Sequence, residues 1–309
     1  MKPVTATAPG KTILFGEHAV VYARPAIAVP VFQVRAQATV EPHDAPRVMI
    51  DARDLARAYD VETAPDDDPL AMIIRATCAR LNVAPRHFAV TIRSTIPLAS
   101  GLGSGAAVSV AIVRALARYF ACELSREEIS ALAYETEKLH HGTPSGIDNT
   151  VIAFEQPVYF IRGQPIETLR VARAFTLAIA DTGIAAPTKI AVGDVRRAWE
   201  RDRARYESLF DEIGAIARAA RAALERGEVD ALGEWMNANQ VVLRALGVSS
   251  PEIETLIGAA ERAGARGAKL SGAGRGGNVI ALVDEETRDA VERALMTAGA
   301  RRVIVTRVE

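Results

Sequence analysis

The chain has 309 residues, of which 49% are hydrophobic and 24% charged, a balance typical of a soluble globular protein with one large domain or two ordinary ones. Its 37 lysines and arginines stand against 38 acidic residues, which gives a formal net charge of −1. Because no overall basic field would attract nucleic acid, nucleic-acid partners are excluded from the expected function.

The cysteines, Cys78 and Cys122, are too few for a disulfide scaffold and form no zinc-binding pattern. The opening MKPVTATAPGK lacks the apolar centre of a signal peptide, and no apolar stretch reaches the ~18 residues that span a bilayer. We therefore expect reduced thiols, a cytoplasmic location and no membrane partner.

The first third of the chain predicts strands, a surface excursion and one helix. Hydrophobic alternation favours strands at residues 4–8, 12–15, 25–40 and 87–94, with a Pro9-Gly10 turn between the first two. Residues 42–68 are polar and proline-containing, and are interpreted as a variable surface excursion. The spacing of apolar residues then predicts a helix over residues 69–81.

The middle of the chain is organised around a glycine-rich loop. The strand at 87–94 is followed by PLASGLGS at 97–104, and an Ala/Val-rich helix is predicted over 104–120. Ser125 and Glu128 have the spacing of a capping box, which predicts a second helix that ends before Gly142. Short apolar runs predict strands at 151–154 and 158–161.

The last part of the chain has a different composition, which is rich in Arg, Glu and Ala. An apolar strand is predicted at 174–181, and helices are predicted at 195–226, at 230–246, from Ser250-Pro251 onward, and at 285–298. Further strands are predicted at 268–270, 278–283 and 302–308. This change in composition predicts an N-terminal domain over 1–170 and a C-terminal domain over 171–309.

A strand, a Gly/Ser loop and a helix, in that order, suit a phosphate group. Glycine lets backbone N–H groups approach an anion, and the helix N-terminus adds unpaired donors and a partial positive charge. The loop lacks the lysine of a Walker A motif, and the G-x-G-x-x-G at 272–277 precedes a strand-like NVIALV instead of a helix. On its own, the loop could equally be a tight strand-to-helix turn.

Three further segments accompany this loop: APGKTILFGEHAVVYARPAIA at 8–28, ETEKLHHGTPSGIDNTV at 135–151 and KLSGAGRGGNVIAL at 269–282. Together and in this order, the four segments resemble the GHMP kinases, the family of galactokinase, homoserine kinase, mevalonate kinase and phosphomevalonate kinase. Within that family, the opening segment and HG-x-PSGIDN look most like the mevalonate kinases. The resemblance spans the whole chain.

The resemblance implies an α+β fold with two lobes, the first like ribosomal protein S5 domain 2 and the second ferredoxin-like. It implies transfer of the γ-phosphoryl group of ATP to the terminal hydroxyl of (R)-mevalonate, with ATP and Mg²⁺ as cofactors, and it admits a homodimer. A kinase for another small hydroxylated metabolite, such as phosphomevalonate or homoserine, is the alternative within the family. A catalytically silent ligand-binding regulator is the alternative from another class.

The resemblance also implies a catalytic pair and a substrate pocket. Asp148 would accept the proton of the attacking hydroxyl, and Lys11 would lie beside that hydroxyl, where its charge keeps the aspartate ionised. Glu17, His18 and Thr188 would contact the substrate. From the residues alone, the alternatives are a solvated Lys11, a core His18 bonded to a carbonyl, a turn-forming Asp148 and a helix-capping Thr188.

Nucleotide and metal ligands follow from the same resemblance. The implied nucleotide-binding residues are Pro97, Ser100, Gly101, Leu102, Gly103, Ser104, Gly105, Ala106 and Gly274. Glu137 and Ser104 would hold Mg²⁺, and an exposed Glu137 paired with His141 is the alternative. The usual loop reads G-L-G-S-S-A, so Gly105 replaces the second serine, which is commonly credited with touching the metal.

The segment at 269–282 departs from the family as well, because Arg275 and Asn278 replace residues that are usually smaller or less polar. Arg275 could reach the nucleotide phosphates or point into solvent. Asn237, Asn239 and Gln240 lie in the middle of a predicted helix, where amides are mildly unfavourable, and are interpreted as support for the base of the site.

Overall fold

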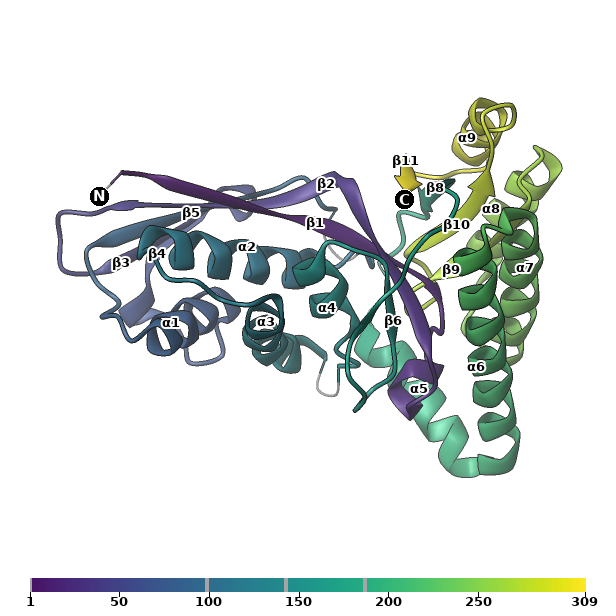
Figure 1. The fold of residues 1–309 in the computed structure, drawn as a ribbon, viewed down its shortest axis with the longest axis horizontal. Coiled ribbons are helices and arrows are strands. Elements are labelled where there is room, and N and C mark those ends of the chain that lie inside the picture. Colours follow the sequence, from purple (N-terminus) through teal and green to yellow (C-terminus); the bar gives the residue numbers. More distant parts are fainter. Residues whose placement is uncertain (1, 98–99, 142–143, 186–187) are drawn as a thin grey trace. The chain divides into compact units, whose positions relative to one another are not determined.

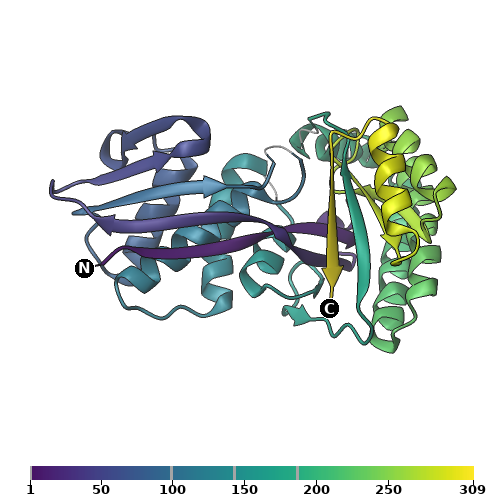
Figure 2. The same cartoon turned by 90° about the horizontal axis from the view of Figure 1, so that it is seen from above.

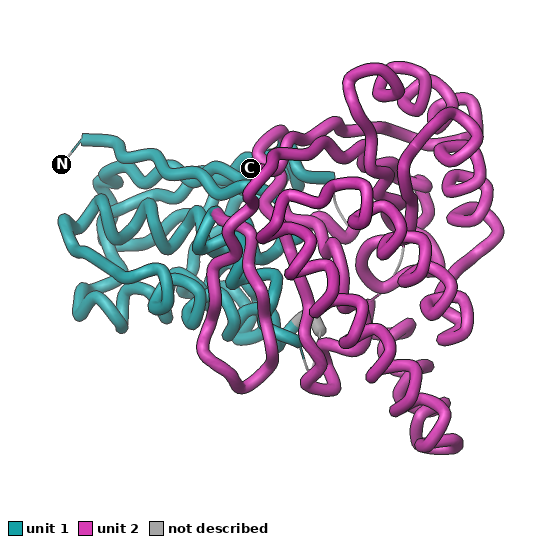
Figure 3. Tube along the Cα trace, turned by 45° about the vertical axis from the view of Figure 1, so that its right-hand side comes forward, with its two compact units in different colours: residues 1–10, 34–97, 103–155 teal, residues 11–33, 98–102, 156–309 magenta. Residues whose placement is uncertain are grey.

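The chain packs into two compact units, and each unit is made of several segments of the sequence (Figure 3). Unit 1 comprises residues 1–10, 34–97 and 103–155, and unit 2 comprises residues 11–33, 98–102 and 156–309. The computed structural model describes residues 2–97, 100–141, 144–185 and 188–309, without the side chains of residues 140 and 141. The α+β class is confirmed. A division into lobes at residue 170 stays a prediction.

The strands of unit 1 form a mixed sheet with one face covered by helices (Figures 1 and 2). They are β1 (Val4–Phe15) and β2 (Ala26–Pro42), which both continue into unit 2, and β3 (Val48–Ala52), β4 (Arg57–Asp60) and β5 (Phe88–Ser94). Their order is β4-β3-β5-β2, and β1 pairs with β2. In β5, Phe88, Val90 and Ile92 are buried and alternate with less buried residues, as expected for a strand with one covered face.

Side-chain caps begin two of the helices of unit 1. The helices of this unit are α1 (Pro69–Leu81), α2 (Ser104–Tyr119), α3 (Arg126–His141) and α4 (Ile147–Phe154), with the short 3-10 turns η2 (Arg53–Leu55) and η3 (Val61–Thr63). Asp68 caps α1 by accepting the Leu70 and Ala71 amides at 3.1 and 2.9 Å. The capping box of α3 is confirmed, because the Ser125 amide donates to the Glu128 carboxylate at 2.8 Å and the Glu128 amide donates back to the Ser125 hydroxyl at 3.2 Å.

Unit 2 contains a four-stranded antiparallel sheet with helices on one face (Figures 1 and 2). Its strands are β8 (Phe175–Asp181), β9 (Gly267–Ser271), β10 (Asn278–Val283) and β11 (Arg302–Val308), in the order β11-β8-β10-β9. This order, with helices after β8 and after β10, is the ferredoxin-like topology that the resemblance implies. The first residues of β2 pair with β6 (Val158–Phe160), which pairs with β7 (Glu167–Thr168).

The helices of unit 2 protect the open edge of its sheet. They are η1 (Ala19–Tyr22), α5 (Thr188–Arg201), α6 (Arg203–Arg226), α7 (Val229–Ala245), α8 (Pro251–Arg262) and α9 (Arg288–Thr297). Because β9 is an edge strand, some of its amides need partners outside the sheet. Asn237 of α7 accepts the Ala268 amide at 2.9 Å, and Gln240 accepts the Leu270 amide at 3.0 Å. These bonds explain two of the mid-helix amides.

Four predicted elements are wrong. The strands predicted at 4–8 and 12–15 are one strand, β1, which tolerates Pro9 because β2 is its only strand partner among the described residues. The strand predicted at 151–154 is the end of α4, since a short apolar run does not distinguish a buried helix from a strand. The helix predicted over 195–226 is two helices, because Asp202 interrupts it and caps α6. The surface excursion at 42–68 contains β3 and β4.

None of the helices within the described ranges is both long and apolar enough to span a membrane.

Candidate active site

The glycine-rich loop enters α2 through two residues in the left-handed region. Gly101 has φ +83° and Gly103 has φ +74°, which are conformations that favour glycine. Gly103 is the N-cap of α2, and it offers no side chain to the first amides of the helix. Gly105, in the first turn, is exposed. The loop therefore ends at a helix N-terminus whose backbone donors are not capped by a side chain, an arrangement that suits an anion.

A buried carboxylate in unit 2 is held by lysines. Glu17 and Lys269 form an ion pair in which both side chains are 0% exposed, and the Lys269 ammonium also donates to the Leu270 carbonyl at 2.6 Å. Lys11, which is 3% exposed, acts electrostatically on the same carboxylate. Burial raises the pKa of Glu17, and the attraction of Lys269 and Lys11 opposes that rise. The burial of Lys11 contradicts the solvated alternative.

His18 lies in a strained turn. Its φ is +60° and its ψ is −48°, and the Ala19 amide donates to the Glu17 carbonyl at 2.7 Å across it, which closes a three-residue γ-turn. Such a conformation costs on the order of 1–3 kcal/mol for a residue with a side chain, and strain of this kind is concentrated at functional sites.

His18 is a neutral imidazole with a defined tautomer. Its Nε2 lies 3.0 Å from the Ala273 carbonyl oxygen, and because a carbonyl only accepts, Nε2 must carry the hydrogen. Nδ1 is then left as an acceptor. Burial lowers the pKa of His18 to about 4, so the ring stays neutral at physiological pH. The bond to a carbonyl expected of a core histidine is present, and Nδ1 remains available for a second partner.

Adjacent residues thus present two buried acceptors. Within the described ranges, neither Glu17 Oε2 nor His18 Nδ1 has a hydrogen-bond partner. Leaving a buried polar atom unpaired costs about 1–3 kcal/mol, so two such atoms next to each other in the sequence indicate donors supplied from outside the chain. Hydroxyl groups are donors of this kind, and the arrangement can recognise a hydroxylated small molecule.

Glu137 and Asp148 lie on neighbouring helices of unit 1. Glu137, near the end of α3, is 4% exposed, so the alternative of an exposed surface partner is wrong; the side chain of His141 lies outside the described part. Asp148 is half-buried in the first turn of α4, where a carboxylate is favoured by the helix N-terminus. The next residue, Asn149, donates to the Ser130 carbonyl at 3.0 Å and to its hydroxyl at 2.8 Å. Asp148 is therefore carried by a helix that is tied to α3.

Thr188 and Gly274 occupy positions that packing partly explains. Thr188 is half-buried at the first position of α5, and the preceding residues 186 and 187 lie outside the described ranges. Gly274 has φ +73°, and a Cβ there would lie 2.0 Å from the Val248 carbonyl oxygen. Close backbone packing alone therefore requires glycine at this position. A role for either residue toward a ligand stays a prediction.

Arg275 is engaged by its own unit. It forms an ion pair with Asp194 of α5 and donates to the Gly247 carbonyl at 3.3 Å. Its hydrogen bond lowers the pKa of Asp194. The guanidinium therefore links the turn after β9 to α5 and does not simply point into solvent.

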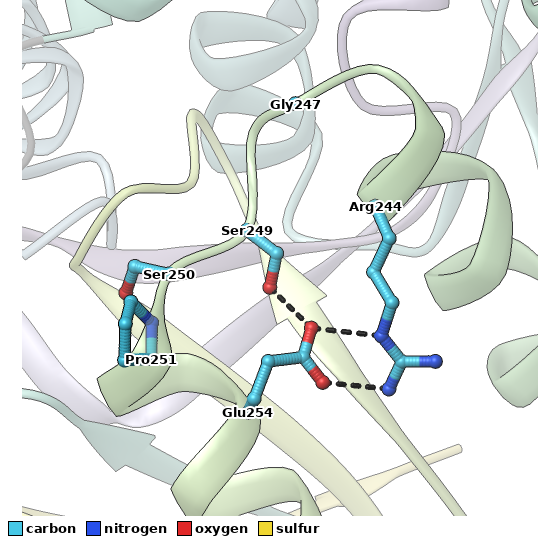
Figure 4. A pocket seen from close by; sticks show the side chains of 6 residues that line it. All are labelled: Arg244, Gly247, Ser249, Ser250, Pro251 and Glu254. Carbon is cyan, nitrogen blue, oxygen red and sulfur yellow. Dashed lines mark hydrogen bonds and ion pairs between the residues drawn. The ribbon is translucent and has the colours of Figure 1, made fainter.

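A surface depression lies at the start of α8 (Figure 4). It is lined by Arg244, Gly247, Ser249, Ser250, Pro251 and Glu254. Glu254 accepts from Arg244 at 2.6 and 2.8 Å and from the Ser249 hydroxyl at 2.5 Å. Because its charged groups satisfy one another, this depression is not the candidate site.

The predicted site residues are divided between the units. Unit 1 holds Pro97, Gly103, Ser104, Gly105, Ala106, Glu137 and Asp148; unit 2 holds Lys11, Glu17, His18, Ser100, Gly101, Leu102, Thr188 and Gly274. Sequence reasoning missed Lys269. The available signal was a lysine between apolar residues of a predicted buried strand, but its partner lies 252 positions away.

Comparison with known proteins agrees with this picture. The GHMP kinases N terminal domain matches residues 70–156, and the GHMP kinases C terminal domain matches residues 220–301. A mevalonate kinase from Pyrococcus horikoshii is 35% identical, over 100% of this chain and 96% of that protein. The crystal structure of L. major mevalonate kinase in complex with R-mevalonate has a TM-score of 0.86 at 29% identity, covering 99% of this chain and 95% of that one.

A second solved structure has the same fold at lower identity. Streptococcus pneumoniae phosphomevalonate kinase, in complex with phosphomevalonate and AMPPNP, has a TM-score of 0.86 at 19% identity, covering 99% of this chain and 100% of that one. At that identity the likeness concerns the fold alone. The matched domains and the relatives that are similar over nearly their whole length show that the chain belongs to the GHMP kinase family, the ATP-dependent kinases of small molecules.

Proposed function

We propose that this kinase transfers the γ-phosphoryl group of ATP to the terminal hydroxyl of (R)-mevalonate and so forms 5-phosphomevalonate. The observation that carries the proposal is the likeness, over the whole chain, to proteins named mevalonate kinase. The unpaired buried acceptors of Glu17 and His18 support a hydroxylated substrate independently of that likeness.

Asp148 is proposed as the general base and Lys11 as the cation beside the reacting hydroxyl. The hydroxyl oxygen forms a bond to the γ-phosphorus as the bond from that phosphorus to ADP breaks, and the hydroxyl proton passes to the Asp148 carboxylate. The Lys11 ammonium stabilises negative charge on the attacking oxygen and on the phosphoryl group. The proposal requires these two side chains to meet at the hydroxyl. Glu17, His18 and Thr188 bind the rest of the substrate, with Glu17 Oε2 and His18 Nδ1 accepting hydroxyl hydrogens.

The glycine-rich loop is proposed to hold the phosphates of ATP. Its backbone N–H groups and the first amides of α2 supply donors without bulky side chains in the way. The proposed contacts are Pro97, Ser100, Gly101, Leu102, Gly103, Ser104, Gly105, Ala106 and Gly274. Phosphoryl transfer needs mainly positioning and charge neutralisation, and these groups contribute to both.

Mg²⁺ is proposed to bind through the Glu137 carboxylate and the Ser104 hydroxyl. A largely buried carboxylate together with a hydroxyl fits this cation, which takes few protein oxygens and completes its shell with phosphate and water oxygens. Among the residues described, no group of three His, Cys, Asp or Glu side chains forms a competing site. When bound, Mg²⁺ would neutralise charge on the phosphates. Gly105 contributes no hydroxyl, so Ser104 or water takes the place of the usual serine.

Phosphomevalonate is an alternative acceptor, because the TM-scores to a mevalonate kinase and to a phosphomevalonate kinase are equal and the fold does not choose between them. Homoserine is the other alternative, from the family resemblance. We propose to measure ADP release in a coupled assay with these alcohols and with galactose. A higher kcat/KM for (R)-mevalonate than for the others is expected. Preference for another acceptor would reassign the substrate, and ATP binding without turnover would favour a silent regulator.

We also propose that the kinase acts in the cytoplasm, without nucleic-acid or membrane partners. The reaction needs only ATP, Mg²⁺ and a soluble alcohol, which agrees with the near-neutral net charge. Light scattering after size-exclusion chromatography would distinguish a homodimer from a monomer.

A further inference from the structure

Asn278 is a buried amide with only half of its hydrogen-bonding groups satisfied. Its side chain is 1% exposed, and its Nδ2 donates to the Ser100 carbonyl at 2.5 Å. Its Oδ1 has no partner among the residues that the structure describes. An apolar residue of similar size would avoid this unpaired acceptor, so fold stability alone does not favour asparagine here.

The backbone at Asn278 is a rigid support. It is the first residue of β10, a central strand of the four-stranded sheet, and lies opposite Asp181 of β8 and Ser271 of β9. Strand neighbours on both sides restrict its movement. The Ser100 carbonyl is therefore bonded to a fixed part of unit 2.

A second strand holds the same loop two residues further on. The Lys11 amide, in β1, donates to the Leu102 carbonyl at 3.0 Å. Two carbonyls of the loop, those of Ser100 and Leu102, are thus directed toward strands. In a trans peptide the N–H of the next residue points opposite to the carbonyl, and no cis peptide is present in the described chain.

This geometry turns the N–H groups of Gly101 and Gly103 away from the strands that hold the loop. Within the described ranges, neither N–H donates to a protein acceptor. The two anchors therefore leave a pair of backbone donors open on the loop that leads into α2. Glycine loses more conformational freedom on ordering than any other residue, so a glycine-rich loop that is ordered in advance binds an anion at lower entropic cost.

We infer that Asn278 is a positioning residue for the nucleotide: by holding the Ser100 carbonyl, it orders the glycine-rich loop so that the Gly101 and Gly103 N–H groups face the phosphates of ATP. The inference rests on the proposed role of the loop in nucleotide binding. It gives a function to a residue that departs from the usual pattern of this segment.

The test uses Asn278→Leu, which removes the bond to Ser100 and the unpaired acceptor together. We expect the Kd for ATP, measured by calorimetry on the full-length protein without acceptor, to rise roughly five- to tenfold, the equivalent of one net hydrogen bond. KM for ATP should rise by a similar factor, whereas KM for (R)-mevalonate should be unchanged. Asn278→Ser, whose side chain is too short to reach the carbonyl, should behave alike and serves if the leucine variant folds poorly.

Thr306→Val is the matched control. Thr306 lies on β11 of the same sheet and is 0% exposed. Among the described residues its buried hydroxyl oxygen also has no partner, and it makes no bond to the loop. This variant should bind ATP like the wild type. Unchanged ATP affinity in the Asn278 variants would overturn the inference, as would an equal loss of affinity in Thr306→Val.

The binding measurement separates this inference from the proposed substrate. If the wild type binds ATP but phosphorylates no mevalonate, weaker ATP binding by Asn278→Leu still supports the positioning role while the proposed function fails. If the wild type does not bind ATP, the inference is wrong.

Discussion

Replacing Lys269 with methionine would expose how strongly the fold depends on one buried ion pair. Methionine has a similar length and no charge, so the substitution removes the partner of Glu17 without opening a large cavity. Both side chains of the pair are 0% exposed, and Glu17 Oε2 already has no partner among the described residues. The variant would leave a buried carboxylate without its ion-pair partner, with only the weaker attraction of Lys11 remaining, and breaking a buried pair in this way typically destabilises a protein by about 3–5 kcal/mol.

The pH dependence of that loss gives a sharper test than its size. Without the attraction of Lys269, the pKa of Glu17 should rise further above its ordinary value of 4.5. Between that value and the raised folded pKa, the native state holds a proton that the unfolded chain releases, so lowering the pH favours the native state. The deficit of Lys269→Met relative to the wild type should therefore be largest near pH 8 and should shrink toward pH 5.

Urea unfolding of both proteins at the two pH values measures this deficit. The double variant Glu17→Gln/Lys269→Met removes both charges and is the matched control. It should be more stable than Lys269→Met at pH 8, and its deficit should vary little with pH. A loss below about 1 kcal/mol for Lys269→Met at pH 8, the range of exposed pairs, would refute the reasoning. A deficit that does not change with pH would refute it as well.

Three further predictions concern the reaction and its pH range. Asp148→Asn, which removes the general base, and Lys11→Ala, which removes charge stabilisation, should each lower kcat by at least about 10²-fold while the Kd for ATP stays near the wild-type value. Unchanged turnover in both would remove the proposed mechanism. Gly105→Ser should lower the Mg²⁺ concentration needed for half-maximal rate, and no change would mean that Ser104 or water already serves. Because burial lowers the pKa of His18 from 6.5 to about 4, native stability should fall by about 3 kcal/mol as the pH drops through this window, as the unfolded chain takes up the proton first. His18→Gln, compared by urea unfolding, should lose that part of the pH dependence; an identical pH profile would contradict the assignment.

The sequence predicted an element correctly where the residues that determine the element are close together in the chain. The capping box at Ser125 and Glu128 and the proline start of α8 were predicted because each cap needs only neighbouring residues. The same holds for β10, whose unbroken apolar run marks a buried strand.

Two of the failures share a cause, which is that tertiary packing decided the local structure. The end of α4 reads as a strand because its β-branched run carries no helical period, yet burial on most sides makes it a helix. β1 continues through Pro9 because, in the part of the chain that is described, it lies beside a single strand, β2, and needs no donor on its other side. Neither environment can be predicted from the residues concerned.

The candidate site was predicted in part, and only through family resemblance. The motifs identified Glu17 and His18, but not the ion pair to Lys269, the γ-turn at His18 or its tautomer. The ion pair and the tautomer depend on contacts between residues more than 250 positions apart, and a single sequence does not identify such partners. The bond from Asn278 to Ser100 joins residues 178 positions apart, and the sequence does not identify that partner either.

Phosphorus NMR of the complete reaction tests the central claim most directly. With (R)-mevalonate, ATP and Mg²⁺, the wild type should produce one new phosphomonoester on the terminal hydroxyl, in a one-to-one ratio with ADP, and Asp148→Asn should produce neither. ADP accompanied only by inorganic phosphate, or a phosphomonoester that forms equally well with Asp148→Asn, would contradict the account.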